Sequence, residues 1–87
     1  MRYRVEVDHR AAKQIESLQP TVRERIIEQL EHLQADPRLE GCSKLKGQRE
    51  PAWRIRVGDY RILYRIHDDL RLVRVYGALR RDEAYRA

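Results

Sequence analysis

The amino-acid sequence predicts an α+β fold, in which an N-terminal strand and an α-hairpin pack on one face of a small, mainly antiparallel sheet. Apolar and polar residues alternate over residues 2–7, as in a half-buried strand. Apolar residues then recur at helical spacing up to residue 33, and alternation returns from residue 53 onward. The resulting element order, βααβββ, is typical of helices layered on a sheet.

The first strand is expected over residues 2–7, where the odd-numbered residues from Tyr3 to Val7 fall on one face. Asp8 follows as a helix N-cap, because its carboxylate can accept a hydrogen bond from the first helical turn. The short helix after it carries apolar residues at positions 11, 12, 15 and 18. Pro20 ends this helix, because proline cannot continue a helical hydrogen-bond pattern.

A second helix is expected to begin at Pro20, which suits a first helical turn, and to end at Asp36 before Pro37. Its apolar residues form one stripe, and its charged residues fall largely on the other side. Two helices joined by so short a connection predict an antiparallel α-hairpin. Residues 38–51 follow no period and contain two glycines and a proline, so a loop is expected there.

The strongest local pattern is a β-hairpin. Two alternating runs, residues 53–57 and 60–66, are separated only by Gly58-Asp59, a typical two-residue turn sequence. A second turn is expected at residues 67–69, followed by a strand over residues 70–76. The polar tail over residues 80–85 is expected to form a short helical turn.

The hairpin determines which side chains share a face of the sheet. Val57 and Tyr60 flank the turn and pair directly, so the alternation can be counted outward from them. The apolar set must face the helices: Trp53, Ile55, Val57, Tyr60, Ile62, Tyr64 and Ile66. The opposite face then carries four arginines: Arg54, Arg56, Arg61 and Arg65.

Arg56 lies directly across from Arg61 in this register, and like charges at such positions destabilise a sheet. The cluster therefore indicates a negatively charged ligand. RNA phosphate fits, because guanidinium groups bind it as a bidentate fork. The alternative interpretation is structural, since exposed strands also carry arginine to keep a sheet face solvated or an edge protected.

Size and composition restrict the class of protein. The chain has 87 residues, enough for one domain over residues 1–87 with a thin core, so a shallow groove is favoured over a deep cavity. The net charge is +5, and the excess lies in residues 41–87, with twelve Lys/Arg against six Asp/Glu. This asymmetry is consistent with a polyanionic partner and equally with a solvated basic surface.

Other reactive residues form no recognisable site. Cys42 is the only cysteine, which excludes an internal disulfide. His9, His32 and His67 are scattered and form no catalytic pair, and Asp68-Asp69 is interpreted as a turn. No metal or cofactor is therefore expected. No apolar run has the length of a membrane span or a secretion signal, so the expected location is the cytoplasm.

Two segments resemble the central signature of the RelE/ParE toxin superfamily: residues 44–47 (KLKG) and residues 53–64 (WRIRVGDYRILY). The preceding strand and α-hairpin are similar in order and length, so the resemblance covers essentially the whole chain. RelE-type members cleave messenger RNA, often in the ribosomal decoding site, whereas ParE-type members share the fold and poison DNA gyrase. The resemblance also implies a cognate antitoxin, typically a small protein that masks the basic face.

The resemblance implies a set of catalytic residues as well. The nuclease branch uses basic residues on the middle strands, an arginine near the end of the last strand and a tyrosine close to the C-terminus. In this sequence these positions are Arg54, Arg56, Arg61, Arg81 and Tyr85. Suitable side chains at all five positions favour an endoribonuclease that cleaves mRNA without a metal.

The implied chemistry uses the 2′-hydroxyl of the RNA, which attacks the adjacent phosphate and leaves a 2′,3′-cyclic phosphate and a 5′-hydroxyl. Arg56 and Arg61 are expected to stabilise the charge of the transition state. Arg54 is expected to position the backbone, and Arg81 to contact the phosphate or the leaving group. Tyr85 is the candidate general base, since nearby arginines lower a tyrosine pKa from its usual value of about 10 by favouring the phenolate.

Further RNA contacts are predicted for four basic residues: Lys44, Lys46, Arg65 and Arg80. Many relatives have Gly-His-Arg where this chain has Leu79-Arg80-Arg81, so a histidine is not available here for proton transfer. Two other functions stay open on the sequence. One is gyrase inhibition of the ParE kind, and the other is non-catalytic binding of RNA or of a protein partner.

Overall fold

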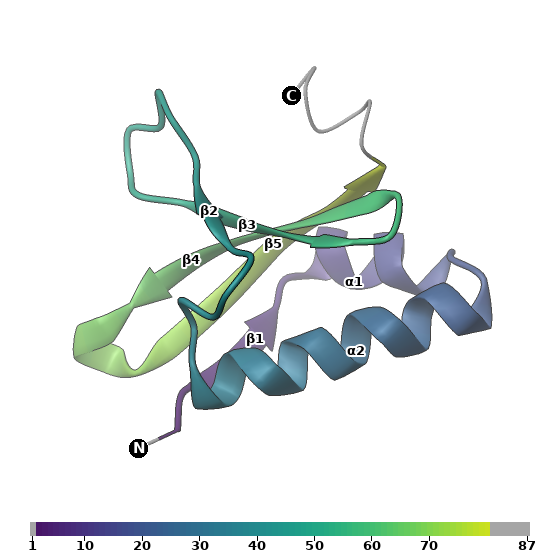
Figure 1. Cartoon of the computed structure of the whole chain (residues 1–87), viewed down its shortest axis with the longest axis horizontal. Coiled ribbons are helices and arrows are strands. Elements are labelled where there is room, and N and C mark those ends of the chain that lie inside the picture. The colour runs from purple at the N-terminus through teal and green to yellow at the C-terminus, as the bar shows by residue number, and fades with distance from the viewer. Residues whose placement is uncertain (1, 81–87) are drawn as a thin grey trace.

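The structure, a computed structural model, describes residues 2–80 and contains two helices and a five-stranded sheet (Figure 1). The elements are β1 (Arg4–Val7), α1 (His9–Glu16), α2 (Pro20–Ala35), β2 (Ser43–Lys44), β3 (Trp53–Val57), β4 (Tyr60–His67), a 3-10 turn (Asp68–Leu70) and β5 (Leu72–Arg80). The strand order is β1-β5-β4-β3-β2; β1 is parallel to β5 and the other pairs are antiparallel. The predicted α+β fold is confirmed.

Two segments of the sheet differ from the prediction. The expected loop over residues 38–51 contains β2, which extends the sheet beside β3. A two-residue strand is too short to show a period in the sequence. The last strand, expected over residues 70–76, covers Leu72–Arg80 instead. The turn before β5 extends beyond the predicted residues 67–69. It includes the 3-10 turn and Arg71, which adopts a left-handed conformation with φ of 49°.

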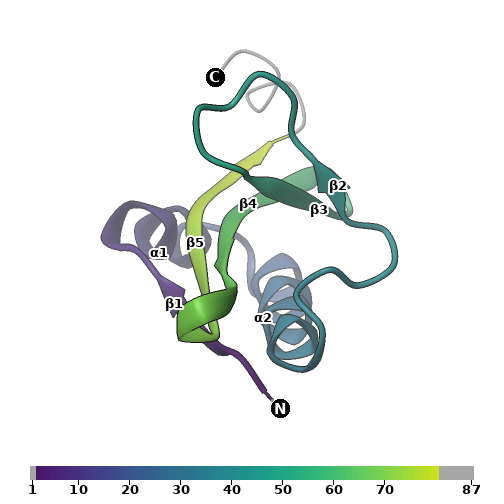
Figure 2. The ribbon, with the colours of Figure 1, turned by 90° about the vertical axis from the view of Figure 1, so that its left-hand side faces the viewer.

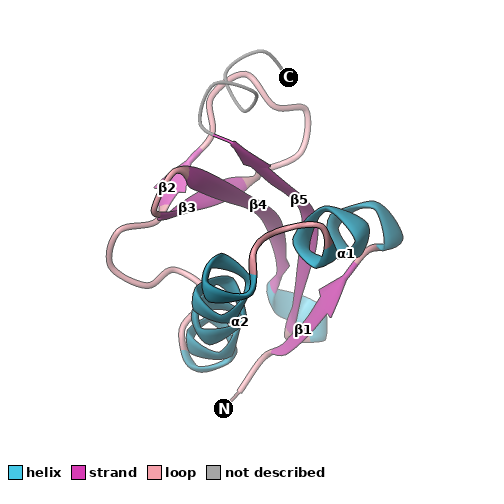
Figure 3. Cartoon of the chain, turned by 90° about the vertical axis from the view of Figure 1, so that its right-hand side faces the viewer, coloured by secondary structure: helices cyan, strands magenta, loops and turns pink. Residues whose placement is uncertain are grey.

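Both helices begin where the sequence predicts, but α1 ends at Glu16, before Leu18 and Pro20. Asp8 caps α1, and its Oδ1 accepts a hydrogen bond of 2.8 Å from the backbone N–H of Ala11. Pro20 stands in the first turn of α2, and Asp36 ends that helix before Pro37. Both helices lie on one side of the sheet, called here the helix face (Figures 1 and 3). The opposite side is called the outer face.

No helix within residues 2–80 has both the length and the apolar character needed to cross a membrane.

The segment between β2 and β3 extends away from the side of the sheet that α2 covers (Figure 2). The helix face and the outer face therefore differ in what lies over them. Helices cover the first, and the second has an irregular segment at one end.

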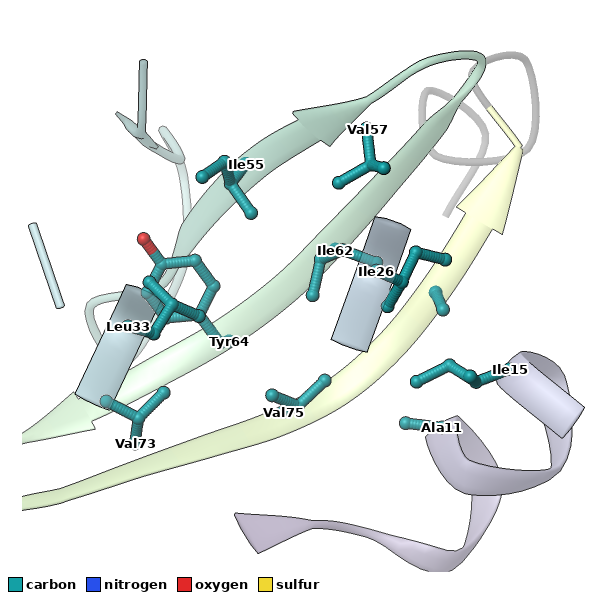
Figure 4. Close-up of a cluster of buried hydrophobic side chains, with 11 residues drawn as sticks. Ala11, Ile15, Ile26, Leu33, Ile55, Val57, Ile62, Tyr64, Val73 and Val75 are labelled. Carbon is teal, nitrogen blue, oxygen red and sulfur yellow. The ribbon is translucent and has the colours of Figure 1, made fainter. Parts of the chain in front are cut away.

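The hydrophobic core lies between the helices and the sheet (Figure 4). Tyr64 is the largest fully buried side chain, and its hydroxyl donates a hydrogen bond of 2.9 Å to the carbonyl oxygen of Pro37. Burial raises the pKa of this hydroxyl, so it remains a donor at neutral pH. The buried cluster consists of Ala11, Ile15, Ile26, Leu33, Ile55, Val57, Ile62, Tyr64, Val73, Val75 and Ala78.

The predicted helix-facing set of the hairpin largely matches this core. Trp53 and Ile66 are half-buried and pack against the cluster. Tyr60 is also half-buried but lies outside the cluster. Its position explains the difference, because Tyr60 is the first residue of β4, next to the Gly58-Asp59 turn, and pairs with the last described residue of β5, Arg80.

An exposed polar cluster joins the N-terminal segment to the turn before β5. Asp68 accepts two hydrogen bonds from Arg38, of 3.1 and 2.8 Å, and one of 2.5 Å from the Tyr3 hydroxyl. These bonds, first from Arg38 and then from Tyr3, lower the pKa of Asp68 to about 2. The sequence indicates only a turn at Asp68. The cluster depends on tertiary contacts between residues far apart in the chain.

The Asp68 cluster predicts a pH-dependent contribution to stability. A carboxyl whose pKa is lowered in the folded state stabilises the fold above its unfolded pKa, near 3.8, and the contribution is lost as the pH falls toward 2. Asp68→Asn is therefore expected to lower the thermal midpoint at pH 7, and the deficit should disappear by pH 2. Circular dichroism melting at both pH values measures this.

The matched control is Asp69→Asn, which removes the neighbouring exposed carboxylate of the same 3-10 turn. It should leave the pH dependence of the thermal midpoint as in the wild type. Equal midpoints for Asp68→Asn and the wild type at pH 7 would mean that the cluster contributes nothing. That result would agree with the small average contribution of exposed ion pairs.

Candidate active site

The predicted register of the β3–β4 hairpin is confirmed. Val57 pairs with Tyr60 across the turn, and Arg56 pairs directly with Arg61. Because alternate residues of both strands enter the core, the remaining positions point to the outer face. This register places the four predicted arginines of the hairpin on the outer face: Arg54, Arg56, Arg61 and Arg65.

Three of these arginines come together in a groove of about 180 Å³. We call it the arginine groove and define it by its lining residues: Gly41, Ser43, Arg54, Arg56 and Arg61. Ser43 reaches the groove because β2 pairs with β3 and sets Ser43 opposite Arg54. Sequence reasoning missed Gly41 and Ser43, since no periodic pattern marks the segment before β3.

The arginines of the groove differ in their exposure to solvent. Arg56 is exposed, Arg54 is half-buried and Arg61 is only 5% exposed. An arginine that merely keeps a sheet face solvated gains nothing from burial, because its guanidinium loses hydration. Its low exposure therefore distinguishes Arg61 from an arginine that only keeps the sheet face solvated. A charge in this position also interacts more strongly with an anion than a charge in bulk water does.

The electrostatics of the groove suit an anion with several oxygen atoms. The described residues that line it include three arginines and no acidic residue. Guanidinium groups stay protonated at any working pH and present donors in a planar fork. Like charges at directly opposite positions also repel each other, and an anion between Arg56 and Arg61 would relieve that repulsion. The arrangement can bind a phosphate group and stabilise extra charge on it.

The other predicted RNA-binding residues are spread over the molecule. Arg65 lies on the outer face, where its Cζ is 4.4 Å from the ring centroid of Tyr76. Lys46 is exposed in the segment between β2 and β3. Lys44 pairs with Trp53, and its Nζ is 5.7 Å from the centroid of the indole ring, which places it away from the groove.

Arg80 also lies away from the groove. It pairs with Tyr60 at the end of β5, whereas its neighbour Leu79 is the residue that pairs with Arg61. An RNA-binding role for Lys44 and Arg80 remains a prediction, because neither residue lines the arginine groove. Arg81 and Tyr85 lie outside the described residues.

The fold and this groove define a class, a small basic α+β domain with an arginine-lined groove on its sheet. The sequence profile of the ParE toxin of type II toxin–antitoxin systems matches residues 5–85. The chain therefore belongs to the RelE/ParE toxin superfamily, as the signature around β3 and β4 predicts. It is a toxin-family protein with a RelE-like fold. A comparison with curated protein sequences gives no match.

Solved structures give the same result. The RelE–RelB complex of Pyrococcus horikoshii is similar, with a TM-score of 0.82, 26% identity and coverage of 93% of this chain and 97% of that one. A double mutant of the Escherichia coli toxin RelE in the free state has a TM-score of 0.81 and 29% identity, covering 98% and 90%. The intact E. coli RelBE complex has a TM-score of 0.78 and 30% identity, covering 90% and 95%.

Proposed function

We propose that the protein is the toxin of a toxin–antitoxin pair and acts as a metal-independent endoribonuclease. It cleaves mRNA at the ribosome and thereby inhibits translation. The observation that carries this proposal is the arginine groove, where Arg54, Arg56 and the buried Arg61 line one anion-sized space. Similarity to RelE toxins from several solved structures supports it.

In the proposed mechanism the scissile phosphate lies in the arginine groove. The 2′-oxygen attacks phosphorus, the bond to the 5′-oxygen breaks, and the products are a 2′,3′-cyclic phosphate and a 5′-hydroxyl. Arg56 and Arg61 stabilise the charge that develops on the phosphate oxygens, because preorganised donors act most strongly where charge increases. Arg54 contacts the RNA backbone next to the scissile phosphate and positions it.

Proton transfer is assigned to the C-terminal segment. Tyr85 accepts the proton of the attacking 2′-hydroxyl, and Arg81 contacts the phosphate or the departing 5′-oxygen. The departing 5′-oxygen takes up a proton from water and becomes the 5′-hydroxyl. Arg65 and Lys46 extend the basic surface along the RNA. The site combines charge stabilisation with one weak base and has no strong acid–base pair, so the cleavage of free RNA is expected to be slow. An ordered substrate on the ribosome supplies positioning that this small domain does not.

The proposed partners follow from the same surface. The named RelE structures include complexes with the antitoxin RelB, and we infer a cognate antitoxin for this chain. A partner that neutralises the outer face would block the arginine groove and inhibit the toxin. mRNA and the ribosome are the proposed targets.

The test of this function is to induce the protein in bacteria and map the 5′ ends of messenger RNA with and without active translation. New 5′-hydroxyl ends that appear only in translated regions are the expected result. New ends that persist without translation would reject the ribosome dependence but keep the nuclease. An unchanged map of 5′ ends in a growth-arrested culture would reject the nuclease.

Inhibition of DNA gyrase is the second candidate function, because the matching profile is that of the ParE toxin. A gyrase poison binds its target and needs no hydrolytic residues. Induction should then accumulate cleaved DNA–gyrase complexes while mRNA stays intact. A non-catalytic RNA- or partner-binding module would likewise keep its toxicity when Tyr85 is replaced by phenylalanine.

A further inference from the structure

The pairing of β4 with β5 contains a β-bulge near the arginine groove. Leu63 pairs with Gly77 and Tyr64 pairs with Val75, so Tyr76 is an extra residue on β5. A Cβ atom on Gly77 would lie 3.3 Å from the Leu63 side chain, so the glycine leaves room for Leu63 on the outer face. Bulges of this kind redirect a side chain, and here the redirected side chain is Tyr76.

The bulge places Tyr76 against Arg65. The Cζ atom of Arg65 lies 4.4 Å from the centroid of the Tyr76 ring, well within the range of about 6 Å for a cation–π contact. The Nε atom of Arg65 also lies 3.4 Å from Oε2 of Glu50. The ring and the carboxylate thus both contact the Arg65 guanidinium group, while 30% of the Arg65 side chain remains exposed.

This pair lies on the same face as the arginine groove and follows it along β4. Arg61 and Arg65 are on one strand with Leu63 between them, which separates them by about 13 Å at roughly 3.3 Å per residue. Arg74 pairs directly with Arg65 and is exposed, so another cation stands beside it. A single strand of RNA with one phosphate in the groove can therefore continue over Tyr76.

We propose that Arg65 and Tyr76 form a stacking platform for a base of the RNA strand that occupies the arginine groove. This inference rests on the proposed function and names a second contact for the same substrate. The base stacks on the exposed side of the Arg65 guanidinium, and the Tyr76 ring supports the guanidinium from below. Bases of single-stranded RNA commonly stack on tyrosine rings and on arginine side chains in this way.

The charges around the pair favour a base over a second phosphate. Glu50 offsets the charge of Arg65 at close range, which weakens attraction for a phosphate at this point. A base is uncharged and needs a flat polarisable surface, which the ring and the guanidinium provide. Arg74 beside the platform is the better contact for the phosphate of that nucleotide.

The test measures the binding of two fluorescein-labelled hexamers by the full-length protein at fixed low salt. One is a 2′-O-methyl adenosine hexamer, which cannot be cleaved because its 2′-oxygen is blocked, and the other has the same backbone without bases. Tyr76→Leu is expected to bind the base-bearing hexamer about tenfold more weakly, as for the loss of one stacked base. Its affinity for the abasic hexamer should not change, and Tyr76→Phe should restore base-dependent binding.

The matched control is Arg4→Gln, which removes a charge from the outer face on β1, away from the platform. Any weakening by this variant should be equal for the two hexamers, because it concerns charge alone. Equal losses for both hexamers with Tyr76→Leu would overturn the proposal and assign the ring a structural role. If Tyr76→Leu binds both hexamers as tightly as the wild type does, the proposal is overturned as well. Weaker binding of the antitoxin by Tyr76→Leu would then assign the ring to contact with a protein partner.

The outcome separates the platform from the nuclease. If the wild-type protein shows base-dependent binding through Tyr76 but cleaves no RNA, the platform stands and the proposed nuclease fails. If the wild-type protein cleaves RNA, and Tyr76→Leu binds each hexamer as tightly as the wild type does, the nuclease stands and the platform fails.

Discussion

Replacing Arg61 by methionine is expected to lower the rate of mRNA cleavage by at least about 100-fold, the usual effect of removing one preorganised donor from a transition-state site. Arg61 is only 5% exposed and lines the arginine groove together with Arg54 and Arg56. Its charge is therefore held in place before the substrate binds. Single-turnover cleavage of ribosome-bound mRNA measures the effect.

Methionine keeps a long unbranched side chain in the buried position, so the variant is expected to stay folded, which thermal unfolding checks. Arg61→Lys keeps the charge and loses the planar fork, so its rate should fall between those of the wild type and Arg61→Met. Arg4→Gln removes an arginine elsewhere on the outer face and should cleave at the wild-type rate. A folded Arg61→Met protein with wild-type activity would exclude Arg61 from the transition-state site.

The hairpin shows why much of this site could be predicted from the sequence. Strand alternation has a period of two, so the Gly58-Asp59 turn alone determines which side chains share a face. The directly opposed pair of Arg56 and Arg61 follows from that count, and the observed register is the same. Local rules of this kind need no knowledge of the tertiary structure.

Other parts of the site depend on contacts that no local pattern encodes. Ser43 enters the groove because a two-residue strand pairs with β3, and that pairing depends on the position of the whole segment before it. Tyr76 faces Arg65 only because one extra residue interrupts the pairing of β4 and β5. The low exposure of Arg61 is likewise a tertiary property that its place in the alternation does not encode.

The fold alone cannot choose between the two proposed activities, since related folds support different chemistry. The matching profile is that of the ParE toxin, while the named solved structures are RelE toxins. The choice depends on the site instead. A groove lined by three arginines can stabilise the charge that develops on a phosphate during RNA cleavage, whereas a gyrase poison requires only a binding surface.

The proposed general base gives the second large effect. Tyr85→Phe keeps the aromatic ring and removes the hydroxyl proposed to accept the proton of the 2′-hydroxyl, so the cleavage rate is expected to fall about 100-fold. The shape of the pH profile should change as well. The wild-type rate should rise with pH as the phenolate fraction grows, and the variant should lose this rise. Single-turnover rates between pH 6 and about pH 9 compare the two.

Tyr60→Phe is the matched control, because it removes a tyrosine hydroxyl beside Val57 on the helix face, outside the arginine groove. Its rate and its pH profile should match those of the wild type. A Tyr85→Phe protein that is slow but keeps the wild-type rise with pH would assign Tyr85 to RNA positioning instead of proton transfer. Cleavage by Tyr85→Phe at the wild-type rate would contradict both roles and leave catalysis to the arginines, with water as the proton acceptor.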